Sequence, residues 1–160
     1  MFEFTFQERL ANNPPFVVAL HGRRKPESER WRNYVDVLRR SYRPELGQIT
    51  IFVVTDGGGP DAAQRKELTA LDQHGAALTH VFATDLVTRG IVTALHWLGI
   101  SIVAHHPSEL HAVCKKSGHS TESILRVMET AQADATPNST LSLIRSAPAT
   151  NSSGERTGSL

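Results

Sequence analysis

Cysteine and long apolar runs are both scarce in this chain of 160 residues. It has a single cysteine, Cys114, which cannot form a disulfide within the chain and therefore indicates a reducing compartment. No stretch approaches the ~20 apolar residues that cross a bilayer. The first residues, MFEFTFQERL, lack the basic segment followed by an apolar segment that marks a secretory signal. These absences predict a soluble, cytoplasmic protein without a membrane span.

The chain also lacks a large excess of charge of either sign. The 17 basic and 16 acidic residues leave a formal net charge of +1, which provides no general attraction to nucleic acid or to an anionic membrane. Residues 23–43 contain eight Lys or Arg against three acidic residues, but stacking aromatics are not interleaved with them as in single-strand binders. Trp31 and Tyr34 instead fall on the apolar stripe of a helix. We interpret the basic segment as a solvated helix face and expect no nucleic-acid partner.

The chain does contain four short, nearly continuous apolar runs, which are typical of strands covered on both faces. The runs lie at residues 16–20, 49–54, 78–83 and 100–104. Helical patterns are found at residues 27–40, 60–74, 85–98, 107–116 and 120–131. The opening FEFTF alternates apolar and polar residues, which predicts an antiparallel edge strand. Strands that alternate with helices predict an α/β domain with a four- or five-stranded, mostly parallel sheet and helices on both faces.

Apolar residues at helical spacing predict which side of each helix is buried. The predicted buried stripes are Trp31, Tyr34, Val35 and Leu38 in the first helix, Ala63, Leu68 and Leu71 in the second, and Val87, Ile91, Ala94, Leu95 and Leu98 in the third. Pro60 is expected at the first position of the second helix, and Gly75 and Gly99 are expected to end the second and third.

Composition changes at residue 133. Of the last 28 residues, 20 are Ala, Ser, Thr, Asn, Pro or Gly. Such a segment buries too little apolar surface to offset the entropy lost on ordering. The sequence therefore predicts one domain at residues 1–132 and a disordered polar tail at residues 133–160.

Three consecutive glycines, Gly57, Gly58 and Gly59, follow the second apolar run. Ligands of open α/β sheets bind outside the carboxyl ends of strands, and backbone N–H groups at the start of a helix favour anions. This predicts a phosphate or carboxylate site, with Arg89 closing over the anion. The alternative is that the glycines form a tight turn that needs positive φ and that Arg89 is a surface residue paired with Asp85. The run matches neither a Walker loop nor a Rossmann fingerprint.

We interpret the other candidate residues as packed side chains rather than as metal ligands or reactive groups. His105, His106, His111 and Cys114 lie within ten residues, but adjacent histidines in an extended segment point to opposite sides, and the usual zinc spacings are missing. No Gly-x-Ser-x-Gly elbow is found, and Cys114 is interpreted as a packed side chain rather than as a thiolate. We therefore predict no metal site, no catalytic residue and no cofactor.

A second line of residues on the third helix predicts an interface. Leu86, Gly90, Thr93 and Trp97 follow one another at spacings of four, three and four residues, opposite the predicted buried stripe. Gly90 permits close approach, and tryptophan is enriched at the centres of interfaces. The line is predicted to pack on a second copy or on another protein. The alternative is that Trp97 covers a neighbouring element of its own chain.

The chain also resembles a known family. Residues 49–71, which read as strand, turn and helix, resemble the centre of STAS domains, the anti-sigma-factor-antagonist fold. The stretch from Thr84-Asp85 through Arg89-Gly90 to Trp97 is similar to small bacterial STAS/Sec14-like proteins, and the resemblance covers residues 16–116. In the signalling members, a serine after the central strand is phosphorylated to break partner binding. The matching loop here has glycine at that position, and only Thr55 offers a nearby hydroxyl.

The resemblance implies a non-enzymatic module for protein interaction or small-ligand binding in bacterial regulation. Its partners are then a protein or a second copy of the chain, and the Sec14-like relatives suggest a small apolar or lipid ligand. The alternative function is a small phosphate- or nucleotide-binding protein, with or without enzymatic activity, that uses the glycine loop and Arg89.

Overall fold

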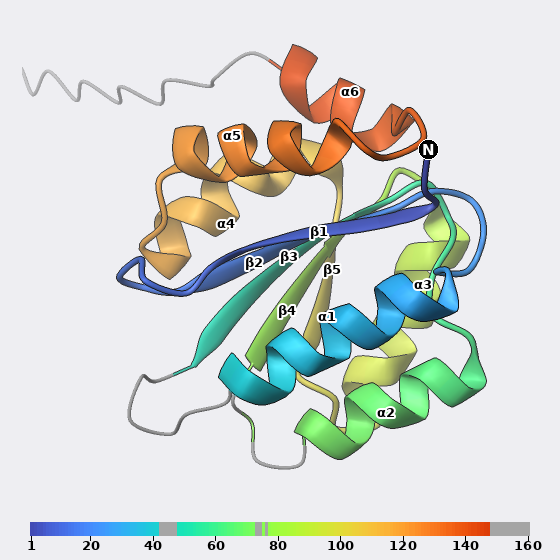
Figure 1. The fold of residues 1–160 in the computed structure, drawn as a ribbon. Coiled ribbons are helices and arrows are strands. Elements are labelled where there is room, and N and C mark those ends of the chain that lie inside the picture. The colour runs from blue at the N-terminus through green and yellow to red at the C-terminus, as the bar shows by residue number, and fades with distance from the viewer. Residues whose placement is uncertain (42–47, 73–74, 76, 148–160) are drawn as a thin grey trace, which may run out of the picture.

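Five strands form one sheet in the part of the chain that the computed structural model describes, residues 1–41, 48–72, 75 and 77–147. The strands are β1 (Phe4–Arg9), β2 (Phe16–His21), β3 (Ile49–Thr55), β4 (Ala77–Phe82) and β5 (Ile102–His105). The helices are α1 (Ser28–Ser41), α2 (Ala62–Asp72), α3 (Leu86–Trp97), α4 (Leu110–Ser117), α5 (Thr121–Gln132) and α6 (Ser139–Ser146), with a short 3-10 helix, η2 (Pro107–Glu109), before α4. The predicted α/β class, with a mostly parallel sheet and helices on both faces, is confirmed (Figure 1).

The order of the strands in the sheet is the order in the chain, β1-β2-β3-β4-β5. β1 is antiparallel to β2, with Phe4 opposite His21, and is the edge strand that the FEFTF pattern predicts. β2 to β5 run parallel, with His21 opposite Thr55. Because the strand order of the described sheet never reverses, its carboxyl edge lacks the crevice in which doubly wound sheets bind their ligands.

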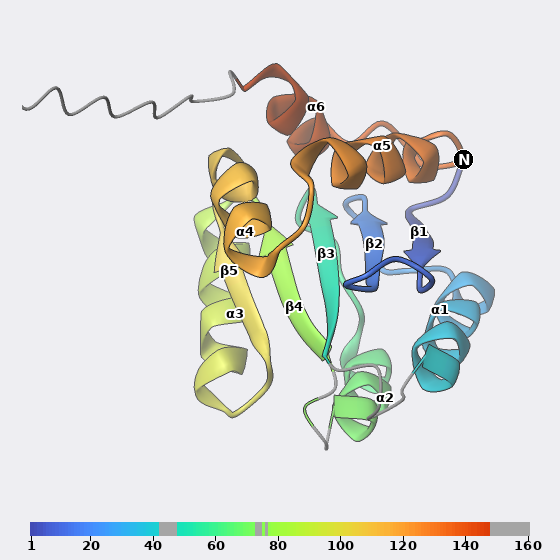
Figure 2. The same cartoon turned by 90° about the vertical axis from the view of Figure 1, so that its left-hand side faces the viewer.

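Helices α1, α2 and α3 lie on one face of the sheet, and α4, α5 and α6 lie on the other (Figure 1; Figure 2). β3 is buried along its whole length, and its side chains alternate between the two cores. Ile51 and Val53 face α1 and its neighbours, whereas Phe52 and Val54 face α4, α5 and α6. Among the described residues, none of the helices combines the length and the apolar composition that a bilayer crossing requires.

α3 packs on the sheet with a different side from the one that the sequence predicts. Val92 is its buried residue, whereas Val87, Ile91 and Leu98 of the predicted stripe are exposed. Apolar residues occupy several sides of this helix, so periodicity alone does not identify the side that docks. The predicted stripe of α3 is therefore wrong, while Trp31 of the α1 stripe is buried as predicted.

The carboxyl-terminal segment is ordered as far as residue 147, which corrects the disorder predicted from residue 133. Leu141 and Ile144 of α6 are buried in the core that α4 and α5 also cover. Two apolar side chains are enough here because the short helix lies across an existing core rather than forming its own. The rest of the predicted tail, residues 148–160, lies outside the described residues.

The polar residues of this segment, which suggested disorder, help to hold it in place. Asn138 caps α6, and its Nδ2 donates a hydrogen bond of 3.0 Å to the carbonyl oxygen of His21 at the end of β2. Before the cap, the N–H of Phe2 donates to the carbonyl oxygen of Asp134 at 2.9 Å, and the N–H of Thr136 donates to that of Phe2 at 2.9 Å. These bonds help to offset the ordering entropy, which a composition argument cannot foresee.

Candidate functional site

A cavity lies between the sheet and the helices α2 and α3. Its volume is about 700 Å³, and it extends along β3 from Ile49 to the glycine loop. The sheet contributes Ile51, Val53 and Val81 to its floor. The helices contribute these apolar side chains to its walls: Trp31, Tyr34, Leu38, Leu68, Leu71, Ile91, Val92 and Leu95. Both the size and the apolar lining are typical of ligand-binding cavities, which measure ~300–1,000 Å³.

The cavity exists because α2 does not fill the space over β3. Gln64 is its buried residue, and Leu68 and Leu71 are only half-buried. Ala63, which the sequence places on the buried stripe, is exposed. A helix with so few large apolar side chains directed at the sheet cannot reach close packing, so part of the apolar face of β3 and β4 borders open space.

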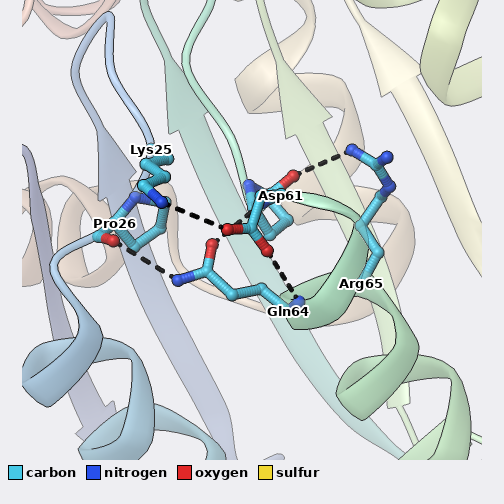
Figure 3. Close-up of polar contacts among 6 residues, drawn as sticks. Lys25, Pro26, Asp61, Gln64 and Arg65 are labelled. Carbon is cyan, nitrogen blue, oxygen red and sulfur yellow. Dashed lines mark hydrogen bonds and ion pairs between the residues drawn. The ribbon is translucent and has the colours of Figure 1, made fainter.

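Polar contacts hold the amino end of α2 (Figure 3). The Asp61 carboxylate accepts a hydrogen bond from the N–H of Gln64 at 3.0 Å, and the Gln64 side chain accepts one from the N–H of Asp61 at 2.9 Å. Gln64 also donates to the carbonyl oxygen of Pro26 at 3.3 Å, and Lys25 forms an ion pair with Asp61 at 3.4 Å. The hydrogen bonds to Asp61, that from the Gln64 backbone above all, lower the pKa of its carboxyl group.

Two further polar contacts hold α2 along its length. Trp31 Nε1 donates to Glu67 Oε2 at 3.2 Å, which joins α1 to α2. The N–H of Ser101 donates to Asp72 Oδ2 at 3.2 Å, which joins the end of α2 to the segment before β5. α2 is therefore an outer wall that is attached at both ends and in the middle, while the space beneath it stays open.

His21 places an imidazole ring at the carboxyl end of the cavity. The side chain is 5% exposed, and its Nδ1 has no hydrogen-bond partner among the described residues. Burial lowers the pKa of His21 to about 4, so near pH 7 the ring is neutral and offers one donor and one acceptor. Burial also raises the pKa of Tyr34 in the wall. His21 and Tyr34 therefore present uncharged hydrogen-bonding groups inside the cavity, while the charged side chains among its lining residues, Arg65, Lys66 and Asp72, come from α2.

The glycine loop at the same end of the cavity forms a tight turn. Gly57 has a φ of +109°, and its N–H donates to Thr55 Oγ1 at 3.0 Å. The N–H of Gly58 donates to the carbonyl oxygen of Gly22 at 2.8 Å, and a Cβ atom on Gly58 would lie 2.5 Å from that oxygen. Positive φ and close backbone approach thus explain two of the three glycines, whereas Gly59 has open space around it.

The start of α2 also differs from the prediction. The helix begins at Ala62 rather than at Pro60, because Asp61 supplies the cap. A carboxylate therefore already occupies the positive end of the helix, where the glycine pattern predicts an exogenous anion.

Arg89 is not among the residues that line the cavity, although all three glycines are. It is half-buried on α3, and its Nε is buried without a partner among the described residues. Asp85, its alternative partner, caps α3 by accepting hydrogen bonds from the N–H groups of Val87 and Thr88 at 3.1 and 2.8 Å. The anion site formed by the glycine loop and Arg89 stays a prediction.

The histidines considered as metal ligands serve separate local contacts. His105 Nε2 lies 2.9 Å from His80 Nδ1, His106 caps η2, and His111 contacts the hydroxyl of Thr121 at 2.9 Å. Within residues 1–41, 48–72, 75 and 77–147, no group of three or more His, Cys, Asp or Glu side chains is placed to hold a metal ion.

Two side chains considered for chemistry are fully enclosed. Cys114 lies in the core under α5, and burial raises the pKa of its thiol to about 11, so the thiolate is scarce near pH 7. The hydroxyl of Thr55, the position nearest the family's phosphorylated serine, is buried and donates to the carbonyl oxygen of Gly58 at 2.6 Å.

The predicted interface line on α3 is largely uncovered. Leu86, Gly90 and Trp97 are exposed, and Thr93 is half-buried with its hydroxyl bonded to the carbonyl oxygen of Arg89 at 2.9 Å. Trp97 is 81% exposed, so no described part of the chain is covered by it. The alternative role of Trp97 as a cover for a neighbouring element is therefore excluded for these residues.

Sequence patterns did not reveal the cavity or the role of His21. A signal for the cavity was available, since the stripe of α2 contains only Ala63, Leu68 and Leu71, and a helix with so few large apolar side chains cannot cover the face of a sheet rich in β-branched residues. His21 gave no signal, because a histidine at the end of an apolar run has no distinguishing spacing. The chain matches no protein-family model, no curated protein and no solved structure.

Proposed function

We propose that the protein is a non-enzymatic binding module that encloses a small, elongated apolar molecule carrying one uncharged hydrogen-bonding group. The observation that carries the proposal is the cavity of about 700 Å³ beneath α2, which has aliphatic and aromatic side chains on its floor and walls. Water molecules form few hydrogen bonds in such a cavity, because few polar groups face the space. An apolar ligand is stabilised there by roughly 25 cal/mol for each Å² of apolar surface removed from water.

The shape of the cavity supports an elongated ligand. The cavity follows the seven residues of β3, a length of roughly 20 Å at the usual rise of a strand. A linear acyl or alkyl chain lies along this axis, with its far end between Leu38, Leu71 and Ile49, which all line the cavity.

The position of His21 supports an uncharged head group at the opposite end. The unpartnered Nδ1 needs a hydrogen bond, because a buried polar atom without one costs about 1–3 kcal/mol. A neutral imidazole accepts or donates such a bond but provides no ionic attraction. A hydroxyl or amide head group therefore suits the His21 side chain, and we propose that Arg65 and Lys66, which line the cavity from α2, stay directed to solvent.

The resemblance to STAS/Sec14-like domains favours the same proposal. The chain is then a cytoplasmic bacterial regulator, and the presence of the apolar molecule, rather than phosphorylation of a loop serine, changes how it meets a protein partner. The enclosed hydroxyl of Thr55 supports this preference over a phosphorylation switch.

The proposal is tested with N-phenyl-1-naphthylamine, a neutral apolar dye with one N–H group. The chain has two tryptophans, and in a Trp97→Phe background only Trp31, in the cavity wall, transfers excitation energy to bound dye. We expect saturable transfer at micromolar dye, and displacement by a long-chain alcohol at lower concentration than by the fatty acid of the same length. Lack of saturable transfer at tens of micromolar dye would show the proposal to be wrong.

A matched pair of variants links binding to the cavity. Leu68→Trp adds a large side chain beneath α2, so we expect at least a tenfold loss of dye affinity together with a higher melting temperature, because filled cavities stabilise. Dye fluorescence and circular dichroism measure the two effects. Leu143→Trp makes the same change at an exposed position of α6 on the other face and leaves both unchanged. Unaltered dye binding by a folded Leu68→Trp variant would contradict the proposal.

A further inference from the structure

The outer side of α3 carries an apolar surface that no described part of the chain covers. Its large side chains are Leu86, Val87, Trp97 and Leu98, which are between 70% and 81% exposed. Ile91, which is 57% exposed, lies beside them toward the cavity, which it also lines. Exposed apolar patches of more than a few hundred Å² mark interaction sites, and an aromatic side chain such as that of Trp97 alone offers roughly 150–250 Å². We call this surface the outer α3 face.

The outer α3 face carries no charged side chain. Gly90 and Ala94 are exposed between its large residues, and Arg89, the one Lys or Arg in the helix, is half-buried on another side. Helices that bind membrane surfaces carry Lys and Arg beside their apolar side, and that feature is missing from α3. An uncharged surface does not repel a copy of itself, as a surface with several like charges does.

The residues of this face are arranged symmetrically about the middle of the helix. Val92, which faces the sheet, is the midpoint. Counted from it, Gly90 and Ala94 are equally distant, as are Val87 and Trp97, and Leu86 and Leu98. Small residues are therefore central, and large apolar residues lie toward both ends.

A two-fold axis through this midpoint superposes the face on itself with the helix direction reversed. Gly90 of one copy then meets Ala94 of the other, so the helices approach closely at the centre. At each end Leu86 meets Trp97 and Val87 meets Leu98 of the second copy, because each of these pairs lies on the same side of the contact at nearly the same height along the helices. Large apolar side chains are thereby buried against one another. Such a self-complementary surface is what an isologous dimer requires.

We propose that two copies of the chain form a two-fold dimer through the outer α3 face, with the two α3 helices antiparallel and crossing at Gly90 and Ala94. This inference does not depend on the proposed ligand. It identifies the occupant of the interface line that contains Leu86, Gly90 and Trp97, and it adds Val87, Ala94 and Leu98 to that line.

Sedimentation velocity across a micromolar concentration series tests the dimer. Wild type sediments as a dimer, and Trp97→Ala raises the dissociation constant at least about 30-fold, as for an interface hot spot. Gly90→Gln gives a folded monomer, because a Cβ at Gly90 meets nothing within 4 Å in the single chain but blocks the crossing. Leu143→Ala, an exposed apolar residue on α6, leaves the dimer intact.

The helix orientation is tested with a short thiol-specific cross-linker. In the antiparallel pair the two copies of residue 90 lie about 6 Å apart along the helix axes, and the two copies of residue 87 about 15 Å apart. Gly90→Cys is therefore cross-linked between copies, and Val87→Cys is not, while the buried Cys114 does not react. A monomeric wild type at about 100 μM, flotation of that monomer with vesicles of neutral lipid, or equal cross-linking of both variants would each overturn the proposal.

Discussion

The carboxylate of Asp56 accepts two hydrogen bonds from Thr140, one from the backbone N–H and one from the hydroxyl, each at 2.8 Å. It also accepts the N–H of Ser139 at 2.8 Å. Asp56 follows β3 directly, so a single side chain joins the centre of the sheet to the first turn of α6. The carboxylate that follows β3 thus holds the last helix at the carboxyl edge of the sheet.

Replacing Asp56 by alanine is expected to lower the free energy of unfolding by about 2–3 kcal/mol, because hydrogen bonds to a charged acceptor are lost and backbone donors at the start of α6 are left unpaired. Urea denaturation followed by circular dichroism measures the change. Asp36→Ala, which removes an exposed ion pair with Arg39, is the control and should change stability by less than about 0.5 kcal/mol. Equal effects of the two substitutions would contradict this role of Asp56.

Shortening the chain at two positions separates the contribution of α6 from that of residues 148–160. A chain that ends at Gln132 exposes the core contacts of Leu141 and Ile144, and we expect it to lose several kcal/mol of stability. A chain that ends at Ala147 should melt within a degree or two of the full-length protein, since residues 148–160 are almost entirely small and polar. Leu141→Ala alone should cost about 2–5 kcal/mol. Differential scanning calorimetry compares these proteins, and equal melting of the two shortened chains would refute the docking of α6.

The two neighbouring glycines at the end of the loop should respond differently to the same substitution. Gly58→Ala places a Cβ 2.5 Å from the carbonyl oxygens of Gly22 and Arg24, so we expect a loss of about 1–3 kcal/mol, as for other overpacked sites. Gly59→Ala meets nothing within 4 Å and should be neutral or slightly stabilising. Thermal unfolding measures both, and a tolerant position 58 would mean that the backbone segments are not in close contact.

Acidification should destabilise the protein through its buried histidines. Burial lowers the pKa of His80 to about 4, with smaller contributions from His105, His119 and Lys116. The pKa of His105 is also lowered, first by burial. The unfolded chain, with histidine pKa values near 6.5, then binds more protons than the folded chain below that pH. The contribution of these histidines to the free energy of unfolding is therefore fully present above about pH 6.5, and it is lost as the pH falls toward 4.

The contribution of His80 is isolated by comparing two variants in urea titrations between about pH 7.5 and 4.5. His80→Gln removes one of the shifted groups and should give a shallower loss of stability with falling pH. His111→Gln, at an exposed position, should follow the wild-type slope. A His80→Gln slope equal to that of wild type would show that this imidazole does not titrate differently in the folded and unfolded chains.

Residues with a single physical interpretation were predicted well. The apolar runs that became β2 and β3 are buried along their whole length, whereas β4 is buried only in its second half. FEFTF became an antiparallel edge strand, as its alternation of apolar and polar residues predicts. α3 was misassigned because its apolar residues cover several sides, and the choice between Val92 and Ile91 depends on the position of β5. α6 was missed because Asn138 and Thr140 count as polar in a composition, although their partners lie far away in the chain.

The candidate site was harder to predict for a related reason. A cavity forms where the surrounding side chains leave space unfilled. Here Leu68 and Leu71 are half-buried because Asp61 and Asp72 hold the two ends of α2 in place. The glycine loop attracted attention because its composition is distinctive. In the structure, Gly57 and Gly58 have geometric explanations.

The bonds from Asp56 to Ser139 and Thr140 also set an order of events during synthesis. The two sides of this contact are separated by 83 residues, which a ribosome adds in roughly 4 to 17 s at 5–20 residues per second. Once β4 and β5 have been added, and until α6 follows, the carboxylate of Asp56 is hydrated rather than bonded to α6, and the apolar face that Leu141 and Ile144 cover lacks its last helix. A chaperone that recognises exposed apolar surface therefore has several seconds in which to bind this chain, until α6 covers that surface.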